Sequence, residues 1–345
     1  MNGNIFNATV LKNRSFGKYE IATLSVCVFV FLLSLLISPY YIYGDQNSYK
    51  NTYDGISNLS LLEGFYFYNS NLGSQELVHY FITWLASGAG FDKDLIMAMS
   101  NSLLAYLSMK FFEKLKVSVF VASVITSSNF YYFVLYFAAE RLKFGFIFLF
   151  ISLLVKNNKK LFLLSAVLAV LSHVQVLLIY VSMFFIRIGS SLLKFYKAFN
   201  VVFIDIFSLV FLLLLSLLLF LFLGDHMYSK YEYYYDIAAQ KNLADLFVVS
   251  VLAILSFWYA KSKIQSIFVF IPVILAVFFV GSDRINMMAY FIFLYYGLKN
   301  NNGLNFGVIG TVIYFAFKSF LFIYCIIEYG DGFNNNISSI NSLFS

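Results

Sequence analysis

The stretch that decides the fold is IATLSVCVFVFLLSLLISPYYIY, residues 21–43. A transmembrane helix needs roughly 20 mainly apolar residues to cross the hydrocarbon core of a bilayer, and this run supplies them without a charge. The run is too long for the core of a signal peptide, and Ser38-Pro39-Tyr40 is a poor cleavage site. Residues 21–43 therefore predict a membrane-spanning helix that the protein retains.

The composition of the whole chain favours the same class. Of its 345 residues, 61% are hydrophobic and 12% are charged, whereas a soluble domain carries about 25% charged residues. A soluble fold of this size cannot bury so much apolar surface. The composition predicts an all-α, polytopic transmembrane helix bundle, and the presence of only two prolines predicts mostly unbroken helices.

Apolar runs continue to residue 327 and predict about eleven spans. The segment 76–90 is shorter and more polar, so we expect a re-entrant or interfacial helix there. Residues 1–20 are predicted to form a cytoplasmic tail, 21–327 a single transmembrane domain, and 328–345 a mobile tail. The predicted spans are 21–43, 95–109, 117–138, 142–155, 161–172, 174–186, 201–223, 246–260, 264–280, 285–298 and 304–327.

Basic clusters between the apolar runs predict the orientation, because Lys and Arg hold their loops in the cytoplasm. Two consecutive cytoplasmic clusters require an even number of crossings between them. This rule makes 117–155 a hairpin with Glu140-Arg141 at its outer tip, and 264–298 a hairpin with Asp283-Arg284 at its outer tip. It also makes 161–186 two short segments that turn near His173, although one long helix is the alternative. Outer loops are expected at 44–75 and 224–245.

Ionisable residues at a membrane edge are costly and are functional candidates by default. The predicted topology places several of them on the outer side: Asp45, Glu76, Glu140, Arg141, His173, Asp283 and Arg284. Two arginines suit a phosphate or pyrophosphate, because the planar guanidinium binds its oxygens bidentately. A nearby carboxylate or imidazole can accept a proton from a hydroxyl. The competing interpretation is that the pairs are helix-end ion pairs at the lipid headgroups.

Several common signatures do not occur in the sequence. We find no GxGxxG, GxxxxGK[ST], HExxH or CxxC motif, so we expect no nucleotide cofactor and no metal. The formal charge of +6 does not indicate nucleic-acid binding, because the basic residues lie in clusters between apolar runs. Cys27 and Cys325 lie inside apolar runs, so a disulfide framework is not expected.

The ordered set of these segments resembles a known family. The stretch from Gly44 to Tyr53, GDQNSYKNTY, is similar to the DxxxYxxxY segment after the first span of EpsG-like polysaccharide polymerases of the Wzy class. Glu76 resembles the next acidic position of that family, and Glu140-Arg141-Leu142-Lys143 its Arg-led helix. Ser172-His173-Val174-Gln175 resembles its His-containing segment, and Asp283-Arg284 with Tyr290 its late Arg-led helix. The similarity covers about residues 20–300.

The resemblance implies a GT-C-like membrane glycosyltransferase that polymerises undecaprenyl-pyrophosphate-linked oligosaccharide repeat units into O-antigen or capsule. Asp45, Glu76 and His173 are then candidate catalytic residues, and we favour an acidic residue as the general base. Arg141 and Arg284 are candidate pyrophosphate ligands. Tyr49, Tyr53 and Tyr290 are candidates for glycan contact or loop support.

The implied setting is the bacterial cytoplasmic membrane, with several crossings and a site that faces outward. The expected partners are the lipid-linked oligosaccharide, membrane lipid, a chain-length regulator and a flippase, without nucleic acid. The alternatives are an O-antigen ligase or another membrane transferase, and a transporter or flippase for the lipid-linked unit. A ligase usually has a larger outer loop than 224–245, and a flippase should place cations at several depths.

Overall fold

The computed structural model describes residues 17–198, 243–280 and 283–333. Within these ranges every regular element is a helix, so the predicted all-α class is confirmed. The predicted span 201–223 and nearly all of the predicted loop 224–245 lie outside the described residues.

Among the described residues, three helical segments are long and apolar enough to cross a membrane: Lys18–Tyr40, Lys93–Lys114 and Asn301–Tyr329. They contain α1 (Lys18–Ile37), α5 (Lys93–Lys114) and α14 (Phe306–Tyr329). A fourth span results if α6 (Val119–Ser128) and the segment Phe130–Ala138, which are bent by 49°, count as one. These segments correspond to the predicted spans 21–43, 95–109, 304–327 and 117–138.

The outer surface of α1 is apolar. Leu24, Leu32 and Leu36 are 64%, 53% and 67% exposed. An apolar surface that is continuous along a helix indicates contact with lipid or another apolar partner. This surface is consistent with membrane association.

The expectation of about eleven spans is not supported. Helices occur at the other predicted spans within the described residues, but several are short: α8 (Glu140–Leu154) has 15 residues and α9 (Lys159–Ser172) has 14. A helix of 15 residues is about 22 Å long, whereas the hydrocarbon core is about 30 Å thick. The remaining helices of this group are α10 (Leu177–Ala198), Leu243–Tyr259, α12 (Lys263–Val280) and α13 (Asp283–Gly297).

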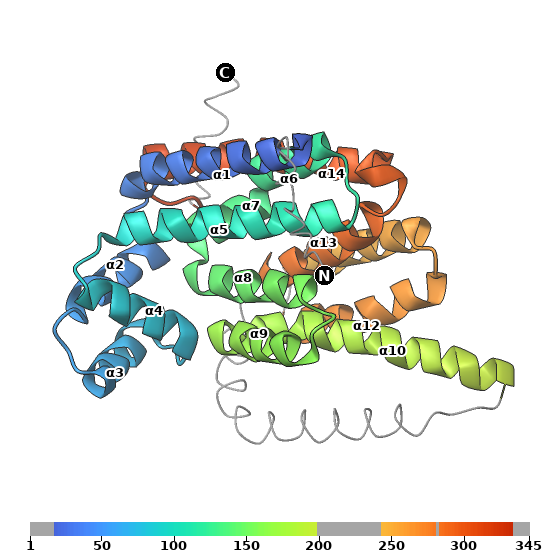
Figure 1. Ribbon diagram of the computed structural model, residues 1–345, viewed down its shortest axis with the longest axis horizontal. Coiled ribbons are helices and arrows are strands. Elements are labelled where there is room, and N and C mark those ends of the chain that lie inside the picture. Colours follow the sequence, from blue (N-terminus) through green and yellow to red (C-terminus); the bar gives the residue numbers. More distant parts are fainter. Residues whose placement is uncertain (1–16, 199–242, 281–282, 334–345) are drawn as a thin grey trace, which may run out of the picture.

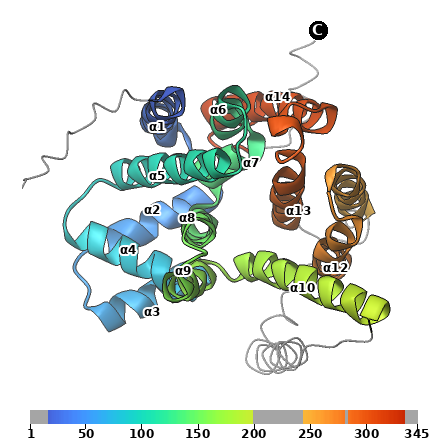
Figure 2. The ribbon, with the colours of Figure 1, turned by 45° about the vertical axis from the view of Figure 1, so that its right-hand side comes forward.

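The helix α8 lies between α5 and α9 (Figures 1 and 2). Three short helices, α2 (Asp45–Gly55), α3 (Leu61–Leu72) and α4 (Leu77–Gly88), lie together on one side, and α12 and α13 lie on the other (Figures 1 and 2). The helix α1 packs along α5, α8 packs against α9, and α10 packs against α12. The helix α2 packs against α3 and α4.

An aromatic segment leads into α8. It consists of α7 (Phe130–Phe133) and the π-helix Val134–Ala138, and every residue from Phe130 to Ala139 is buried. Ala139 then adopts φ −109° and ψ 63°, and a new helix begins at Glu140. Because of this break, Glu140 and Arg141 lie in the first turn of a helix rather than in the middle of one.

The end of α14 is attached to the segment before α2. The carbonyl of Gly330 accepts hydrogen bonds from the N–H groups of Ile42 and Tyr43 at 3.1 and 3.0 Å. The Tyr41 hydroxyl donates to Asp331 Oδ1 at 3.2 Å. The first part of the predicted C-terminal tail, 328–333, therefore contacts the segment before α2. Residues 334–345 lie outside the described residues.

Candidate functional site

The segment predicted as the outer loop 44–75 contains two helices, α2 and α3. Gln46, Tyr49 and Tyr53 are spaced by three and four residues, and all three are buried. This spacing places them on one face of a helix. Gly44 precedes the helix with φ 62°, a conformation that glycine adopts without steric cost, and Asp45 occupies the first turn. The helix α2 thus presents Asp45 and Tyr49 one turn apart.

Arg141 lies at the centre of the site. Its Nη1 donates to Glu76 Oε2 at 2.9 Å, and its Nε donates to the Tyr49 hydroxyl at 3.0 Å. The helix dipole disfavours a cation in the first turn of α8, and the ion pair with Glu76 offsets this effect. The side chains of Arg141 and Glu76 are only 17% and 16% exposed. The guanidinium group therefore donates hydrogen bonds to two different side chains from two of its edges, a planar arrangement that an ammonium group lacks.

Glu76 comes from the start of α4, the short helix predicted within 76–90. It occupies the N-cap position, but its side chain makes no capping hydrogen bond. Short polar side chains normally fill this position and accept from the helix backbone. The carboxylate of Glu76 is instead bound to Arg141.

His173 lies at a break in the helical chain. The helix α9 ends at Ser172, His173 is extended with φ −163° and ψ 119°, and a 3₁₀ turn at Val174–Val176 leads into α10. The predicted change of direction near His173 thus coincides with a helix break. His173 Nε2 lies 3.9 Å from Glu76 Oε1, which is too long for a hydrogen bond.

Gly145 allows α8 to approach this break closely. A Cβ atom at Gly145 would lie 2.7 Å from Val176 Cγ2 and 3.5 Å from His173 Cβ. Gly145 follows Arg141 by one helical turn on α8. The absence of a side chain at Gly145 therefore sets the distance between the helix that carries Arg141 and the turn that carries His173.

Arg284 reaches the same helix from α13. Its Nη2 lies 3.5 Å from Asp45 Oδ2, and the two side chains are 37% and 59% exposed. The two arginines were predicted at the tips of separate hairpins, and they contact residues one turn apart on α2. The structure thus brings together Asp45, Tyr49, Glu76, Arg141, His173 and Arg284.

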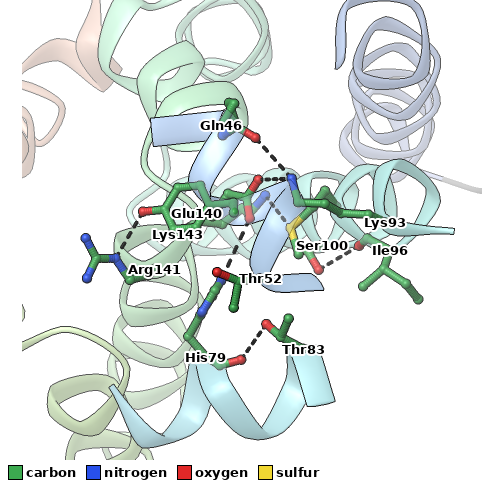
Figure 3. Close-up of polar contacts among 12 residues, drawn as sticks. Gln46, Thr52, His79, Thr83, Lys93, Ile96, Ser100, Glu140, Arg141 and Lys143 are labelled. Atoms are coloured by element: carbon green, nitrogen blue, oxygen red, sulfur yellow. Dashed lines mark hydrogen bonds and ion pairs between the residues drawn. The ribbon is translucent and has the colours of Figure 1, made fainter. Parts of the chain in front are cut away.

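A second charged cluster lies beside the first and is more deeply buried. Lys93 Nζ donates to Glu140 Oε1 at 2.6 Å and to Gln46 Oε1 at 3.0 Å (Figure 3). Gln46 Nε2 donates to the Phe137 carbonyl at 2.7 Å. Glu140 is a neighbour of Arg141 in sequence, so this cluster joins α2, α5 and the start of α8. Nothing in the sequence singles out Lys93, because its position resembles that of an ordinary lysine at the end of a helix.

His79 and Lys143 extend the buried cluster. His79 Nδ1 is 2.9 Å from the Tyr68 hydroxyl, and its Nε2 is 3.8 Å from Glu140 Oε2. Lys143 Nζ donates to Asn101 Oδ1 at 2.7 Å. The sequence does contain a signal for Lys143, because it is a single lysine within an otherwise apolar run. A buried ammonium group requires polar partners, so such a lysine indicates a buried polar cluster.

Burial shifts the titration of two groups near Arg141. Removal from water raises the pKa of Tyr49 to about 12, and the nearby guanidinium of Arg141 opposes this shift only in part. Removal from water also lowers the pKa of His79, against the opposing effect of Glu140. Tyr49 is thus a neutral hydrogen-bonding partner, and His79 is uncharged at neutral pH.

Two predicted site tyrosines lie apart from Arg141. The Tyr53 hydroxyl donates to the Phe91 carbonyl at 2.9 Å, so Tyr53 anchors α2. Tyr290 is fully buried, accepts from Asn129 Nδ2 at 2.9 Å, and packs against Tyr131 and Phe315. Tyr290 therefore belongs to the aromatic core. Asp283 has no described side chain.

The described ranges contain no group of three or more His, Cys, Asp or Glu side chains that could hold a metal ion. Comparison of the chain with protein-family models, with curated proteins and with solved structures gives no match. The groups that the structure brings together are two guanidinium groups, two partly accessible carboxylates and an imidazole.

Proposed function

We propose that the chain is a membrane glycosyltransferase that polymerises undecaprenyl-pyrophosphate-linked oligosaccharide repeat units at the outer face of the bacterial cytoplasmic membrane. The observation that carries the proposal is the contact of Arg141 and Arg284 with adjacent turns of α2, each beside a carboxylate. Guanidinium groups bind phosphate oxygens bidentately, so two arginines that contact the same helix are suited to a pyrophosphate. The resemblance to EpsG-like polymerases and to GT-C-like bundles belongs to the same proposal.

The chemistry that fits these groups is glycosyl transfer. A hydroxyl of the acceptor repeat unit attacks the anomeric carbon of the donor glycan, and a new C–O bond forms. The bond between that carbon and the pyrophosphate oxygen breaks, and undecaprenyl pyrophosphate leaves with the electron pair. The acceptor proton passes to Glu76 or Asp45, and the guanidinium groups stabilise the charge that develops on the leaving group.

The proposed setting is a membrane with the arginines on the outer side. Its test is labelling of single cysteines by an impermeant thiol reagent in intact cells, with Cys27 and Cys325 replaced by serine. Positions beside Asp45 and Arg284 should be labelled, and Asn157 and Asn158, between α8 and α9, should be protected. Labelling of Asn157 from outside contradicts the orientation.

Deletion of the gene in its source organism tests the activity. Loss of a polymerase should leave single repeat units on the lipid and no polymer, and the wild-type gene should restore polymer. Loss of a ligase would instead leave complete polymer on the lipid carrier. Loss of a flippase would leave repeat units on the inner face. A chain-length regulator and a flippase are the proposed partners.

A further inference from the structure

The arginines proposed to bind the pyrophosphate are both in contact with carboxylates. Arg141 Nη1 lies 2.9 Å from Glu76, and Arg284 Nη2 lies 3.5 Å from Asp45. Carboxylate and phosphate oxygens compete for the same guanidinium donors. An anion that enters the site must therefore displace a carboxylate.

We propose that Glu76 binds the edge of Arg141 that would bind a phosphate, and that the anionic headgroup of the substrate displaces the Glu76 carboxylate toward His173. This inference rests on the proposed function and adds a control step to it. Glu76 would become available as a proton acceptor only when a pyrophosphate has taken its place. Proton removal would thus be coupled to occupancy of the site.

The surroundings of Glu76 support this exchange. Its carboxylate makes no capping hydrogen bond that would hold it in place on α4. The backbone N–H of Gln175 donates to His173 Nδ1 at 3.2 Å, so a neutral His173 carries its proton on Nε2, the atom that faces Glu76 at 3.9 Å. A small movement of Glu76 away from Arg141 brings it within hydrogen-bond distance of that donor.

Arg141 keeps its position during such an exchange. Its Nε bond to the Tyr49 hydroxyl, at 3.0 Å, does not involve Glu76. Burial raises the pKa of Tyr49 to about 12, so its hydroxyl stays neutral. The guanidinium is therefore held on one edge by α2 while its other edge changes partner.

The test is binding of inorganic pyrophosphate to the full chain in detergent, measured by isothermal titration calorimetry in metal-free buffer. Glu76→Gln removes the competing charge at constant shape, so it should lower the Kd by about tenfold or more, as expected for one charged hydrogen bond. The same variant should lose polymerisation, which gives tighter binding with slower turnover. Glu113→Gln is the control, because Glu113 pairs with Lys110 at the far end of α5. Its Kd should equal that of the wild type.

His173 provides a second variant. His173→Phe should weaken pyrophosphate binding in the wild-type background and have no effect when Glu76 is already Gln. An unchanged or higher Kd in Glu76→Gln, or no binding in any variant, overturns the exchange. If polymerisation depends on Arg141 but the Kd of Glu76→Gln is unchanged, the exchange fails and the proposed function stands. If the Kd responds as expected but the wild-type protein transfers no glycan, the function fails and the exchange stands.

Discussion

Arg141 and Arg284 contact side chains that are one turn apart on α2. Arg141 donates to the Tyr49 hydroxyl at 3.0 Å, and Arg284 lies 3.5 Å from the carboxylate of Asp45. No local sequence pattern links α8 with α13, so this relationship comes from the tertiary fold. Because both arginines contact α2, substitutions of the two residues can be compared in the same assay.

Arg141→Lys should reduce polymer formation far more than Arg284→Lys. Lysine keeps the charge but loses the planar fork with which Arg141 holds Glu76 and Tyr49. Arg284 is more exposed and has the longer ion pair. The measurement is conversion of lipid-linked repeat units into polymer at matched protein levels, with the exposed Arg187→Lys as the control. Full activity of both site variants would show that the arginines act only as headgroup anchors.

Asp45→Asn and Glu76→Gln distinguish the candidates for the general base. At least one of them should lower polymer formation by about 10²–10⁴-fold, the range typical of a lost general base. Both substitutions preserve side-chain shape. Glu76→Gln removes the carboxylate partner of the mostly buried Arg141 and should lower the free energy of unfolding, so polymer formation is compared at matched levels of folded protein. Near-normal polymer from both variants would assign proton removal to His173 or to another group.

Glu140→Gln should destabilise the fold, because it leaves the Lys93 ammonium buried without its carboxylate. Breaking one partner of a buried pair typically costs about 3–5 kcal/mol of unfolding free energy. The control is Glu113→Gln, which breaks the more exposed pair with Lys110 and should cost at most about 1 kcal/mol. Reversible unfolding in mixed micelles measures both values. Replacement of the whole pair, by Lys93→Met with Glu140→Leu, should recover part of the lost free energy of unfolding. Equal losses for Glu140→Gln and Glu113→Gln would contradict a structural role for the Lys93–Glu140 pair.

Gly145→Val should separate His173 from Glu76. A Cβ atom at Gly145 would already lie 2.7 Å from Val176 Cγ2, and overpacking of this kind typically costs about 1–3 kcal/mol. We expect polymer formation to fall and Val176→Ala in the same chain to restore part of it. Gly310→Ala is the control, since no atom lies within 4 Å of a Cβ at Gly310 on α14. It should stabilise the protein by up to about 1 kcal/mol. Unchanged activity of Gly145→Val would exclude the proposed spacing role.

The stability of the wild type should fall as the pH falls below 6.5. Burial lowers the pKa of His79 from its usual value of 6.5, so in this range the unfolded chain binds a proton that the folded chain does not. The free energy of unfolding then decreases with decreasing pH. His79→Asn retains a polar partner for Tyr68 and should show a smaller decrease between pH 7.5 and 5.5, measured by thermal unfolding in detergent. Parallel curves would show that His79 does not contribute.

The sequence predicted the helical class because apolar runs of this length have few alternatives. It did not predict how many helices are long enough to cross a bilayer, since hydropathy marks apolar residues and not the breaks between them. Asn129 and Ala139 interrupt the run between α6 and α8 without a proline. Such breaks depend on packing of the aromatic segment Phe130–Ala138.

The short helices around the site were only partly predictable. The polar composition of 44–75 suggested a loop, but Ser60 and Glu63 form a capping box at the start of α3, a pattern that the sequence displays. The spacing of Gln46, Tyr49 and Tyr53 was likewise visible. The pairing of Lys93 with Glu140 joins residues 47 positions apart, and no local periodicity encodes it.

The attachment of α14 to the start of α2 has a consequence for biosynthesis. The Tyr41 hydroxyl is bonded to Asp331, a residue 290 positions later, and Gly330 holds Ile42 and Tyr43 by their backbone N–H groups. Asp45 therefore leaves the ribosome long before Gly330 and Asp331, which hold the segment that leads into α2, have been synthesised. A nascent protein that lacks α14 would contain all the candidate site residues but not the contacts of Gly330 and Asp331 with residues 41–43. The site would therefore reach its final structure only after α14 has been translated.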